Sequence, residues 1–313
     1  MNDKRFFSWL FMAAAFISMA SCEKPVIDES DDDTEIVDNG ANEGKVQIRF
    51  NALNVDGADY LSGESFSPAA TRASATLRDV CKRLTLAVFN EDGKKVKTIS
   101  QLQTDKSFGQ LALSLPEATY TFVFIADNGT DNPTISKPTE VKFKDNKVTD
   151  TFYYCDQLTL DDSSDTDYEV TLKRAVAMFR LVVNDPTPTV VKQMKFYYTG
   201  GSSTFDPTTG YGSVNSRQTE YRTVSAEAYN GVSSYDVYTF PHDGGKKLQM
   251  EISALDGTSS SASVKYVRTI DDVPVTQNVI TTYSGNFFGE SPEGGRSFTI
   301  SVDSEWGEEH YNY

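Results

Sequence analysis

The stretch Tyr168–Val183, YEVTLKRAVAMFRLVV, decides the fold. Its first half alternates apolar and polar residues, with Tyr168, Val170 and Leu172 as the apolar ones, which is the period-2 pattern of a strand with one buried face. Its second half, AVAMFRLVV, is apolar on both faces apart from Arg180, as expected of a central strand. The stretch therefore predicts two successive β-strands, one half-buried and one central.

The same pattern recurs along the chain. In Lys45–Val55, KVQIRFNALNV, the apolar residues Val46, Ile48 and Phe50 alternate with polar ones. Gly, Asn and Asp turns separate most of the apolar runs, and the best helical window, Leu77–Leu84, is short. An all-β fold of two tandem β-sandwich units is therefore predicted. Its strands are expected near residues 45–55, 83–89, 94–100, 111–115, 120–126, 140–143, 148–154, 168–172, 175–183, 194–198, 235–240, 248–254, 264–270 and 298–302.

Two acidic stretches divide the chain. Residues 161–167, DDSSDTD, contain no apolar residue and are interpreted as a linker between an N-terminal domain at 45–160 and a C-terminal domain at 168–313. Residues 22–44 are acidic with almost no aromatic content, so they are interpreted as a flexible tether.

The first 21 residues are predicted to be a secretory signal peptide. They contain two basic residues, a short apolar run and small residues before Cys22, and the run is too short for a comfortable membrane span. Met-Ala-Ser-Cys resembles the lipobox of bacterial lipoproteins, which implies cleavage between Ser21 and Cys22 and attachment of acyl chains such as palmitate to Cys22. The alternative is an ordinary secreted protein that is cut near Ala20.

The net charge of −16 bears on the partners of the chain. Nucleic-acid binding is not expected, because no basic patch is apparent that could neutralise phosphates. Binding of the folded surface to an anionic leaflet is disfavoured for the same reason. Membrane association is therefore expected to depend on the lipid on Cys22.

Cys81 and Cys155 are the remaining thiols. A disulfide between them is permitted outside the cytoplasm, and two separate buried thiols are the alternative. No nucleophile elbow, phosphate-binding loop or metal-ligand spacing occurs, and the two histidines, His242 and His310, lie far apart. We therefore expect no catalytic residue, no cofactor and no metal site, and an enzyme is disfavoured.

Three passages together resemble the FimB-like minor fimbrial subunits of type V pili, a family of anchor and tip lipoproteins. They are RLTLAVFNEDGKKV, YEVTLKRAVAMFRLVV with its pair Arg174 and Ala175, and DDVPVTQNVITTYSGNFFG followed by FTISVDSEW. Their order behind a lipobox carries the resemblance. It implies two transthyretin-like β-sandwich domains and a non-enzymatic, surface-exposed subunit, lipid-anchored in the outer membrane, that assembles with other fimbrial subunits in cell adhesion.

The resemblance also implies assembly by β-strand addition, in which a strand from a neighbouring subunit pairs with an exposed sheet edge. The strand containing Val46, Ile48 and Phe50 is the candidate for the exchangeable edge, because a long loop separates it from the next strand. Related shaft subunits are matured by cleavage after an arginine in a comparable loop. Cleavage after Arg72 would detach the lipid and the first strand; the alternative for Arg72 is an ordinary surface arginine.

A second hypothesis is a carbohydrate-binding surface lipoprotein of a glycan-uptake system. It shares the lipobox, the tether and the tandem β-domains. An exposed cluster of two or three aromatic rings would favour it, whereas an apolar groove along a sheet edge would favour strand exchange.

Overall fold

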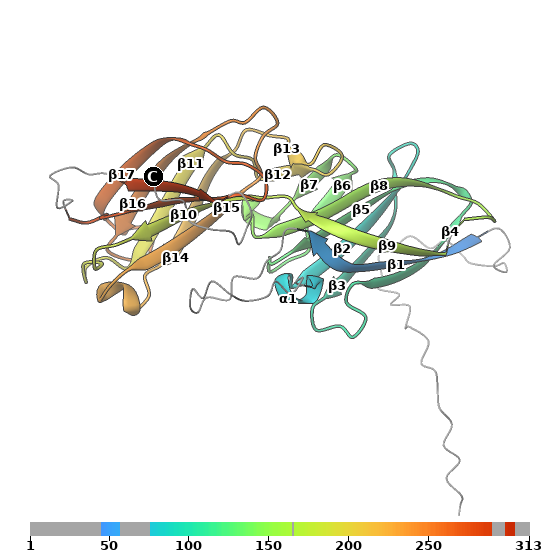
Figure 1. Ribbon diagram of the computed structural model, residues 1–313, viewed down its shortest axis with the longest axis horizontal. Helices are drawn as coiled ribbons and strands as arrows, with labels where there is room; N and C mark the ends of the chain where they lie inside the picture. The colour runs from blue at the N-terminus through green and yellow to red at the C-terminus, as the bar shows by residue number, and fades with distance from the viewer. Residues whose placement is uncertain (1–44, 57–75, 165, 290–297, 304–313) are drawn as a thin grey trace, which may run out of the picture. The chain divides into compact units, whose positions relative to one another are not determined.

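The computed structural model describes residues 45–56, 76–164, 166–289 and 298–303 (Figure 1). Their regular structure is almost entirely β-strand, and their helices are α1 (Leu77–Val80), η1 (Lys144–Asn146) and η2 (Glu227–Tyr229). The predicted all-β fold is confirmed. None of these helices has the length and apolar character to cross a membrane. The predictions on Ser21, Cys22, the tether and Arg72 lie outside the described residues.

A seven-stranded sheet contains the first nine strands except β6 and β7. Its order is β3-β2-β5-β8-β9-β1-β4. The strands are β1 (Lys45–Asp56), β2 (Arg83–Asn90), β3 (Lys95–Leu102), β4 (Gln110–Pro116), β5 (Ala118–Asp127), β8 (Thr151–Leu160) and β9 (Asp167–Arg174).

The central strands β2 and β5 are buried on both faces. On β2, Leu86 and Val88 belong to one apolar cluster, whereas Ala87 and Phe89 belong to another. Successive side chains of a strand point to opposite faces, so each face of the sheet covers its own core. This explains why both strands are almost continuously apolar in sequence.

The sheet bends back over its first core. β8 and β9 pair at only two positions, Phe152↔Arg174 and Tyr153↔Lys173. Beyond this short pairing lie β9, β1 and β4, whose inward side chains join those of β2 and β5 in one apolar cluster. One bent sheet therefore supplies both layers of the first sandwich.

Two four-stranded sheets form the second sandwich around a separate apolar cluster. Their orders are β15-β10-β18-β19 and β14-β11-β16-β17. The first contains β10 (Ala177–Val183), β15 (Ser233–Thr239), β18 (Ile280–Gly285) and β19 (Phe298–Asp303). The second contains β11 (Gln193–Thr199), β14 (Arg217–Thr223), β16 (Leu248–Leu255) and β17 (Val264–Val273).

A small antiparallel sheet joins the two sandwiches. Its strands are β6 (Thr134–Lys137), β7 (Glu140–Lys142), β12 (Thr204–Asp206) and β13 (Tyr211–Gly212). β7 and β12 pair with each other, although they come from the two halves of the chain. Four aromatic rings extend this contact: the ring centroids are 4.8 Å apart in Tyr153–Phe205, 4.9 Å in Phe205–Phe240 and 5.7 Å in Phe143–Phe240.

The strand expected to open the C-terminal domain lies in the seven-stranded sheet. β9 pairs with β1 and β8, and β10 is the first strand of the second sandwich. The division of the chain at 161–167 remains a prediction. When each strand is assigned to the domain that contains its sheet, the boundary between the two domains falls after Arg174.

Candidate functional site in the first strand and its neighbours

β1 lies inside the seven-stranded sheet and not at its edge. It pairs antiparallel with β4 from Lys45↔Pro116 to Asn51↔Gln110, and parallel with β9 from Arg49↔Asp167 onward, with an irregularity after Asn51. The expectation of an edge position is therefore wrong in this folded state. β9 follows β1 by more than a hundred residues, so the sequence gives no local sign of this pairing.

The predicted alternation of β1 is confirmed. Ile48 is 0% and Phe50 is 1% exposed, and Val46 packs as a partly buried residue against the same core. The ring centroid of Phe50 lies 5.0 Å from that of Phe122 and 5.1 Å from that of Phe124. Truncating a buried phenylalanine costs about 3–5 kcal/mol, so Phe50 is the principal apolar anchor of β1.

Polar side chains on the outer face of β1 form hydrogen bonds with side chains of β9. Arg49 donates from Nε and Nη2 to the two carboxylate oxygens of Asp167, at 2.7 and 2.9 Å. Asn51 donates to Oε1 of Glu169 at 3.0 Å. The hydrogen bond from Arg49 lowers the pKa of Asp167. These contacts are exposed, so they define the alignment of β1 on β9 and contribute little to stability.

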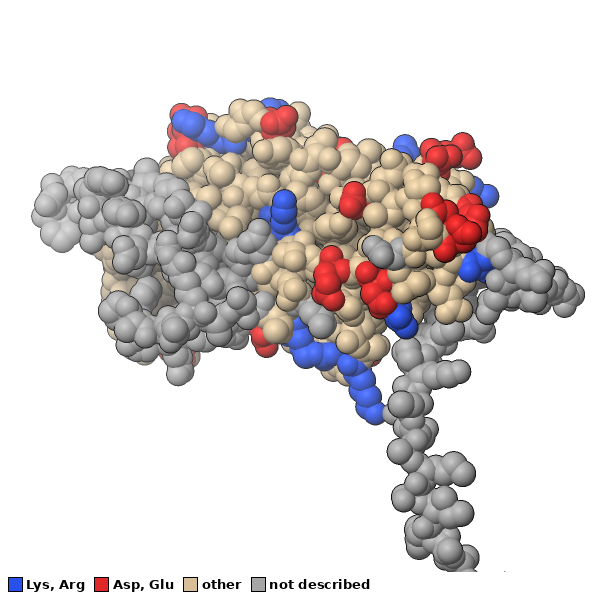
Figure 2. Space-filling model, turned by 45° about the vertical axis from the view of Figure 1, so that its right-hand side comes forward, with Lys and Arg blue, Asp and Glu red and all other residues tan. Residues whose placement is uncertain are grey.

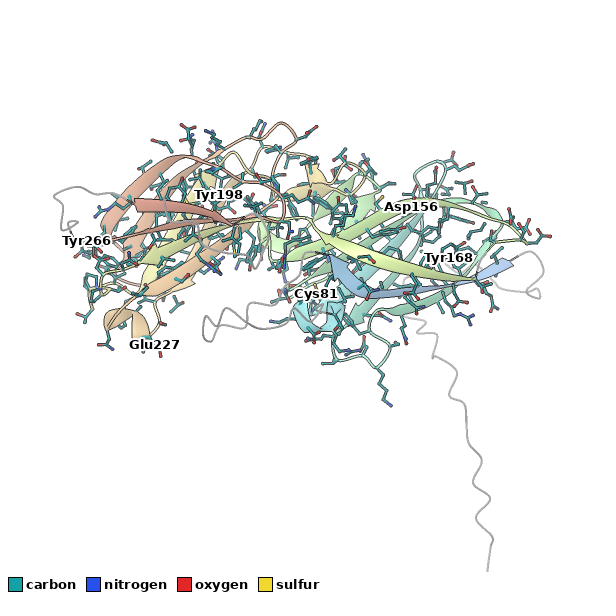
Figure 3. The ribbon with its side chains drawn as sticks, in the orientation of Figure 1. Cys81, Asp156, Tyr168, Tyr198, Glu227 and Tyr266 are labelled. Carbon is teal, nitrogen blue, oxygen red and sulfur yellow. The ribbon has the colours of Figure 1, made fainter. Side chains whose placement is uncertain are left out.

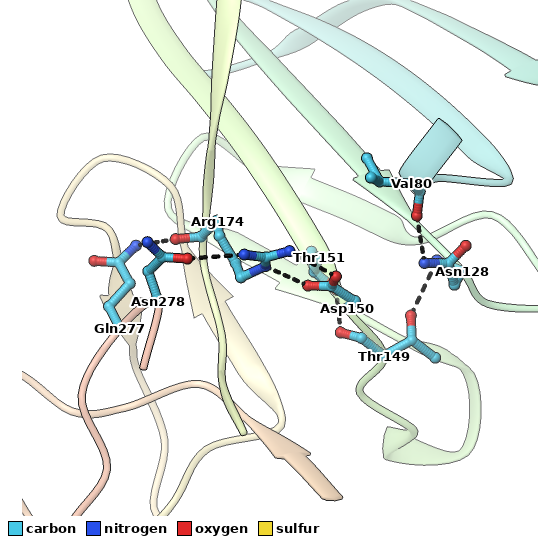
Figure 4. A network of polar contacts seen from close by, with 8 residues as sticks. All are labelled: Val80, Asn128, Thr149, Asp150, Thr151, Arg174, Gln277 and Asn278. Atoms are coloured by element: carbon cyan, nitrogen blue, oxygen red, sulfur yellow. Dashed lines mark hydrogen bonds and ion pairs between the residues drawn. The ribbon is translucent and has the colours of Figure 1, made fainter. Parts of the chain in front are cut away.

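The C-terminal end of β9 holds a buried ion pair (Figure 4). The guanidinium of Arg174, whose side chain is 2% exposed, donates to both carboxylate oxygens of Asp150 at 2.8 and 3.1 Å. It also donates to Oδ1 of Asn278 at 2.9 Å and lies 4.7 Å from the ring centroid of Phe152. Burial raises the pKa of Asp150, and Arg174 opposes this shift.

Two further hydrogen bonds connect the segment around Arg174 to the second half of the chain, and both are accepted by main-chain carbonyls. Gln277 donates from Nε2 to the carbonyl of Arg174 at 2.8 Å, and the amide of Asn278 donates to the carbonyl of Val176 at 2.9 Å. The segment between β9 and β10 is thus held by hydrogen bonds from the residues just before β18.

Cys81 and Cys155 are both free thiols in the structure, so no disulfide joins them there, although the sequence permits one. Cys81, which follows α1 (Figure 3), belongs to the first core, whereas Cys155 packs on the opposite face of the sheet. Burial raises the pKa of Cys155 to about 11 and that of Cys81 well above its usual range. Neither residue has the lowered pKa of a reactive cysteine.

No other side-chain chemistry stands out in the described residues. No group of three His, Cys, Asp or Glu there could hold a metal ion. His242 lies beyond β15 at the start of a turn in which its carbonyl accepts from the amide of Gly245. The face shown in Figure 2 carries side chains of both charges.

Sequence reasoning missed the buried charges. In the sequence, Arg174 is notable only as part of the Arg174–Ala175 pair, and Asp127 falls in the Asp-Asn-Gly turn after an apolar run. Asp127 is 0% exposed, its Oδ1 accepts from the amide of Gly129 at 2.6 Å, and its Oδ2 has no described partner. Burial raises the pKa of Asp127 to about 6. A charged residue at the end of an apolar run was the only signal available in the sequence.

Comparison with solved structures shows the fold. A candidate adhesin from Bacteroides ovatus superposes with a TM-score of 0.50 at 10% identity, over 82% of this chain and 93% of that chain. The fimbrial anchor protein Mfa2 from Porphyromonas gingivalis gives a TM-score of 0.44 at 10% identity, over 83% and 98%. A fimbrial assembly protein from Parabacteroides distasonis gives 0.41 at 12% identity, over 82% and 94%.

No curated protein matches the chain in sequence. One family model does match, over residues 39–313, and it is described as a family of unknown function, DUF6562. The match spans every described residue, both sandwiches and the sheet between them. The chain therefore belongs to the DUF6562 family.

Proposed function

We propose that the chain is a non-enzymatic, surface-exposed anchor or tip subunit of an adhesive fimbrium, tied to the outer membrane by lipid on Cys22. Its partners are other fimbrial subunits, and it assembles by β-strand addition at the position of β1. The sequence resemblance to FimB-like subunits supports this proposal. The Bacteroides ovatus structure, which shares the fold, is described as a candidate adhesin.

The observation that carries the proposal is the position of β1 between β9 and β4. β1 inserts the alternating side chains Ile48, Phe50 and Ala52, each at most 1% exposed, into the first core. Departure of β1 would leave unpaired main chain on two strands above an apolar core. An incoming strand with alternating apolar residues satisfies both requirements, because its main chain pairs and its side chains fill the core.

Two of the outer sheet edges, β3 and β15, are less suited to strand addition. β3, at one edge of the seven-stranded sheet, carries the exposed lysines Lys95 and Lys97. On β15 the carbonyls of Asp236 and Tyr238 already accept from Arg222 Nε and Tyr198 Oη, both at 3.0 Å. Lysines and occupied main-chain groups are features by which proteins protect sheet edges. This favours the position of β1.

The mass of the mature protein from purified membranes tests the anchoring and the maturation. Acyl chains on Cys22 are expected. Cleavage after Arg72 would leave β1 on the lipid-bearing fragment, which supports exchange at β1. An intact chain past Arg72 would support an anchor role, in which β1 leaves its place between β9 and β4 while it remains joined to the rest of the chain. A free amino terminus upstream of Cys22 would overturn the lipid anchor.

A reversible lock on β1 tests strand addition directly. Asn51 and Glu169 are in side-chain contact, so the double variant Asn51→Cys/Glu169→Cys is designed to link β1 to β9. If subunits assemble by strand addition, gel electrophoresis of heated samples should show a ladder of polymer bands. We expect the oxidised variant to be missing from this ladder and the reduced variant to return to it.

The matched control is Thr119→Cys/Thr159→Cys, which links β5 to β8 where the two hydroxyls are 2.9 Å apart. This control should enter the ladder in both redox states. If the locked β1 variant polymerises like the control, strand addition at β1 is wrong.

The carbohydrate-platform hypothesis has no matching observation. Among the described aromatic residues, Tyr221 is the one that is largely exposed, at 50%. A platform needs two or three exposed rings side by side, so the fimbrial proposal is preferred.

A further inference from the structure

The hairpin of β8 and β9 is open between its two ends. The strands pair only at Phe152↔Arg174 and Tyr153↔Lys173, and they run apart along the rest of their length (Figure 1). β8 pairs with β5 along its whole length, so only its other side is available. From Tyr154 to Leu160, no described strand pairs with that side of β8, and we call this run the open edge of β8.

Main-chain groups of the open edge point into the gap between the two strands. Thr151 gives their direction, because its carbonyl accepts from the amide of Ala175, just after β9, at 2.8 Å. The main-chain groups of alternate residues in a strand point to the same side, so those of Cys155 and Gln157 point the same way as those of Thr151. The amide of Gln157 donates to Oδ1 of Asp156 at 2.8 Å. The remaining groups of Cys155 and Gln157 are therefore placed to pair with an added strand.

The side chains of the open edge cover the first core only in part. Tyr154 and Leu158 pack as partly buried residues against that core. Asp156, labelled in Figure 3, lies between them on the same face of β8, opposite Phe122 on β5, which is 0% exposed. Asp156 itself is exposed, so the sandwich is open to solvent at this point. A segment that pairs with β8 would place alternate side chains over Tyr154, Asp156 and Leu158.

Asp156 determines which segments can bind there. Its carboxylate accepts from the hydroxyl of Tyr154 at 2.9 Å and takes part in none of the described ion pairs. Asp161, Asp162 and Glu169 add exposed carboxylates to the same hairpin, in a chain of net charge −16. A charge on the inward face of an edge strand excludes apolar strands, because docking would bury that charge without a partner. A cation opposite Asp156 removes this penalty, so the open edge selects a basic segment.

We propose that the open edge of β8 binds an extended segment of another protein by β-strand addition. The segment presents a lysine or arginine to Asp156, between two apolar side chains that cover Tyr154 and Leu158. This site differs from the position of β1, because β8 gains a strand and no strand of this chain has to leave. The inference is therefore independent of the fimbrial proposal.

The test is fluorescence anisotropy with two fluorescein-labelled peptides, TVTKTVT and TVTETVT. In each peptide the two valines and the central residue lie on one face of an extended chain, at the spacing of Tyr154, Asp156 and Leu158. The protein is the full chain with Cys22→Ser. We expect the lysine peptide to bind about tenfold more tightly than the glutamate peptide.

Asp156→Lys should reverse this preference, a result that a loss of fold cannot produce. The matched control is Asp162→Lys, the same change of charge at an exposed residue in the turn after β8, and it should keep the preference of the parent chain. The inference is overturned if the lysine peptide does not bind at roughly 1 mM protein, if both peptides bind equally, or if Asp156→Lys and Asp162→Lys have the same effect.

A proline in the open edge tests the pairing of the main chain. Gln157→Pro removes an amide that points into the gap, and proline is tolerated where the N–H side of a strand faces solvent. It should weaken binding of the lysine peptide about tenfold, while thermal unfolding stays close to that of the parent chain. A folded Gln157→Pro chain that binds like the parent would overturn strand addition at β8. If this variant does not fold, the comparison of Asp156→Lys with Asp162→Lys decides.

Discussion

Asp127 is a carboxyl group whose burial makes the stability of the fold depend on pH. Its pKa is raised from 3.8 to about 6, chiefly by burial, while the amide of Gly129 and the charge of Arg83 oppose the shift. Folding therefore favours the protonated form. The stabilisation is fully present below the unfolded pKa near 4 and is lost as the pH rises through about 6.

This residue gives a first prediction. Between pH 4.5 and 7.5, the free energy of unfolding of the parent chain should fall by up to about 2 kcal/mol relative to Asp127→Asn, which cannot titrate. The measurement is urea unfolding of both chains across this range. Parallel pH profiles for the two chains would show that Asp127 does not titrate as described.

Thiol chemistry provides a second prediction. Because burial raises the pKa of both Cys81 and Cys155, few thiolates are present at pH 8, and the native chain should react slowly with Ellman's reagent. A chain with Cys22→Ser should show two thiols once it is unfolded without reductant. The absence of thiols after unfolding would indicate a disulfide between Cys81 and Cys155.

Among the elements, β9 depends on the ion pair at its end. Arg174→Met should destabilise the fold by about 3–5 kcal/mol, because it leaves the buried carboxylate of Asp150 without its partner. Arg174→Met/Asp150→Asn should recover part of that loss, since no unpaired charge remains. Denaturant unfolding of both variants measures the difference.

A natural control exists at the other end of β9. Arg49 forms a similar two-bond contact with Asp167, but both side chains are more than half exposed, at 59% and 55%. Arg49→Met should leave the free energy of unfolding nearly unchanged, because water and salt screen an exposed ion pair. Equal losses for Arg49→Met and Arg174→Met would show that burial does not determine the strength of these pairs.

The sequence predicts the apolar strands well and the polar ones poorly. β2, β5 and β10 are found as expected, because their apolar runs are long and are bounded by turns. The sequence does not predict β14, RQTEYRT, because its inward residues are polar: Gln218 and Glu220 are 4% and 7% exposed. Gln218 donates to the carbonyl of Asn146, which lies far away in the sequence, and Glu220 accepts from Arg222 on the same strand.

The candidate site at β1 could likewise be predicted only in part from the sequence. The side chains of β1 that enter the core follow from alternation alone. The parallel pairing of β1 with β9 does not follow from alternation, because the two strands are more than a hundred residues apart and leave no local signal. The bend between β8 and β9 does not follow from it either. The packing of β14 on β15 is a further case, since the two strands come from different sheets.

At the scale of the whole molecule, the two sandwiches should unfold together. They share the small antiparallel sheet, the aromatic contacts of Phe205 and Phe240, and the hydrogen bonds around Arg174. Calorimetry of the parent chain should therefore show one transition. Phe240→Ala, which removes the ring that contacts both Phe205 and Phe143, should separate it into two. Two transitions in the parent chain would show that the sandwiches are independent.

The orientation of β1 determines how this molecule bears a mechanical load. Tension that enters through the residues before Lys45 acts along the axis of β1. This strand is bonded laterally to β4 and to β9, so the pull loads many hydrogen bonds at once in shear and does not unzip them one after another. Withdrawal of β1 would also drag Phe50 out of its core. A subunit that is tethered at this end is therefore loaded in the direction in which β1 resists separation from β4 and β9 most strongly.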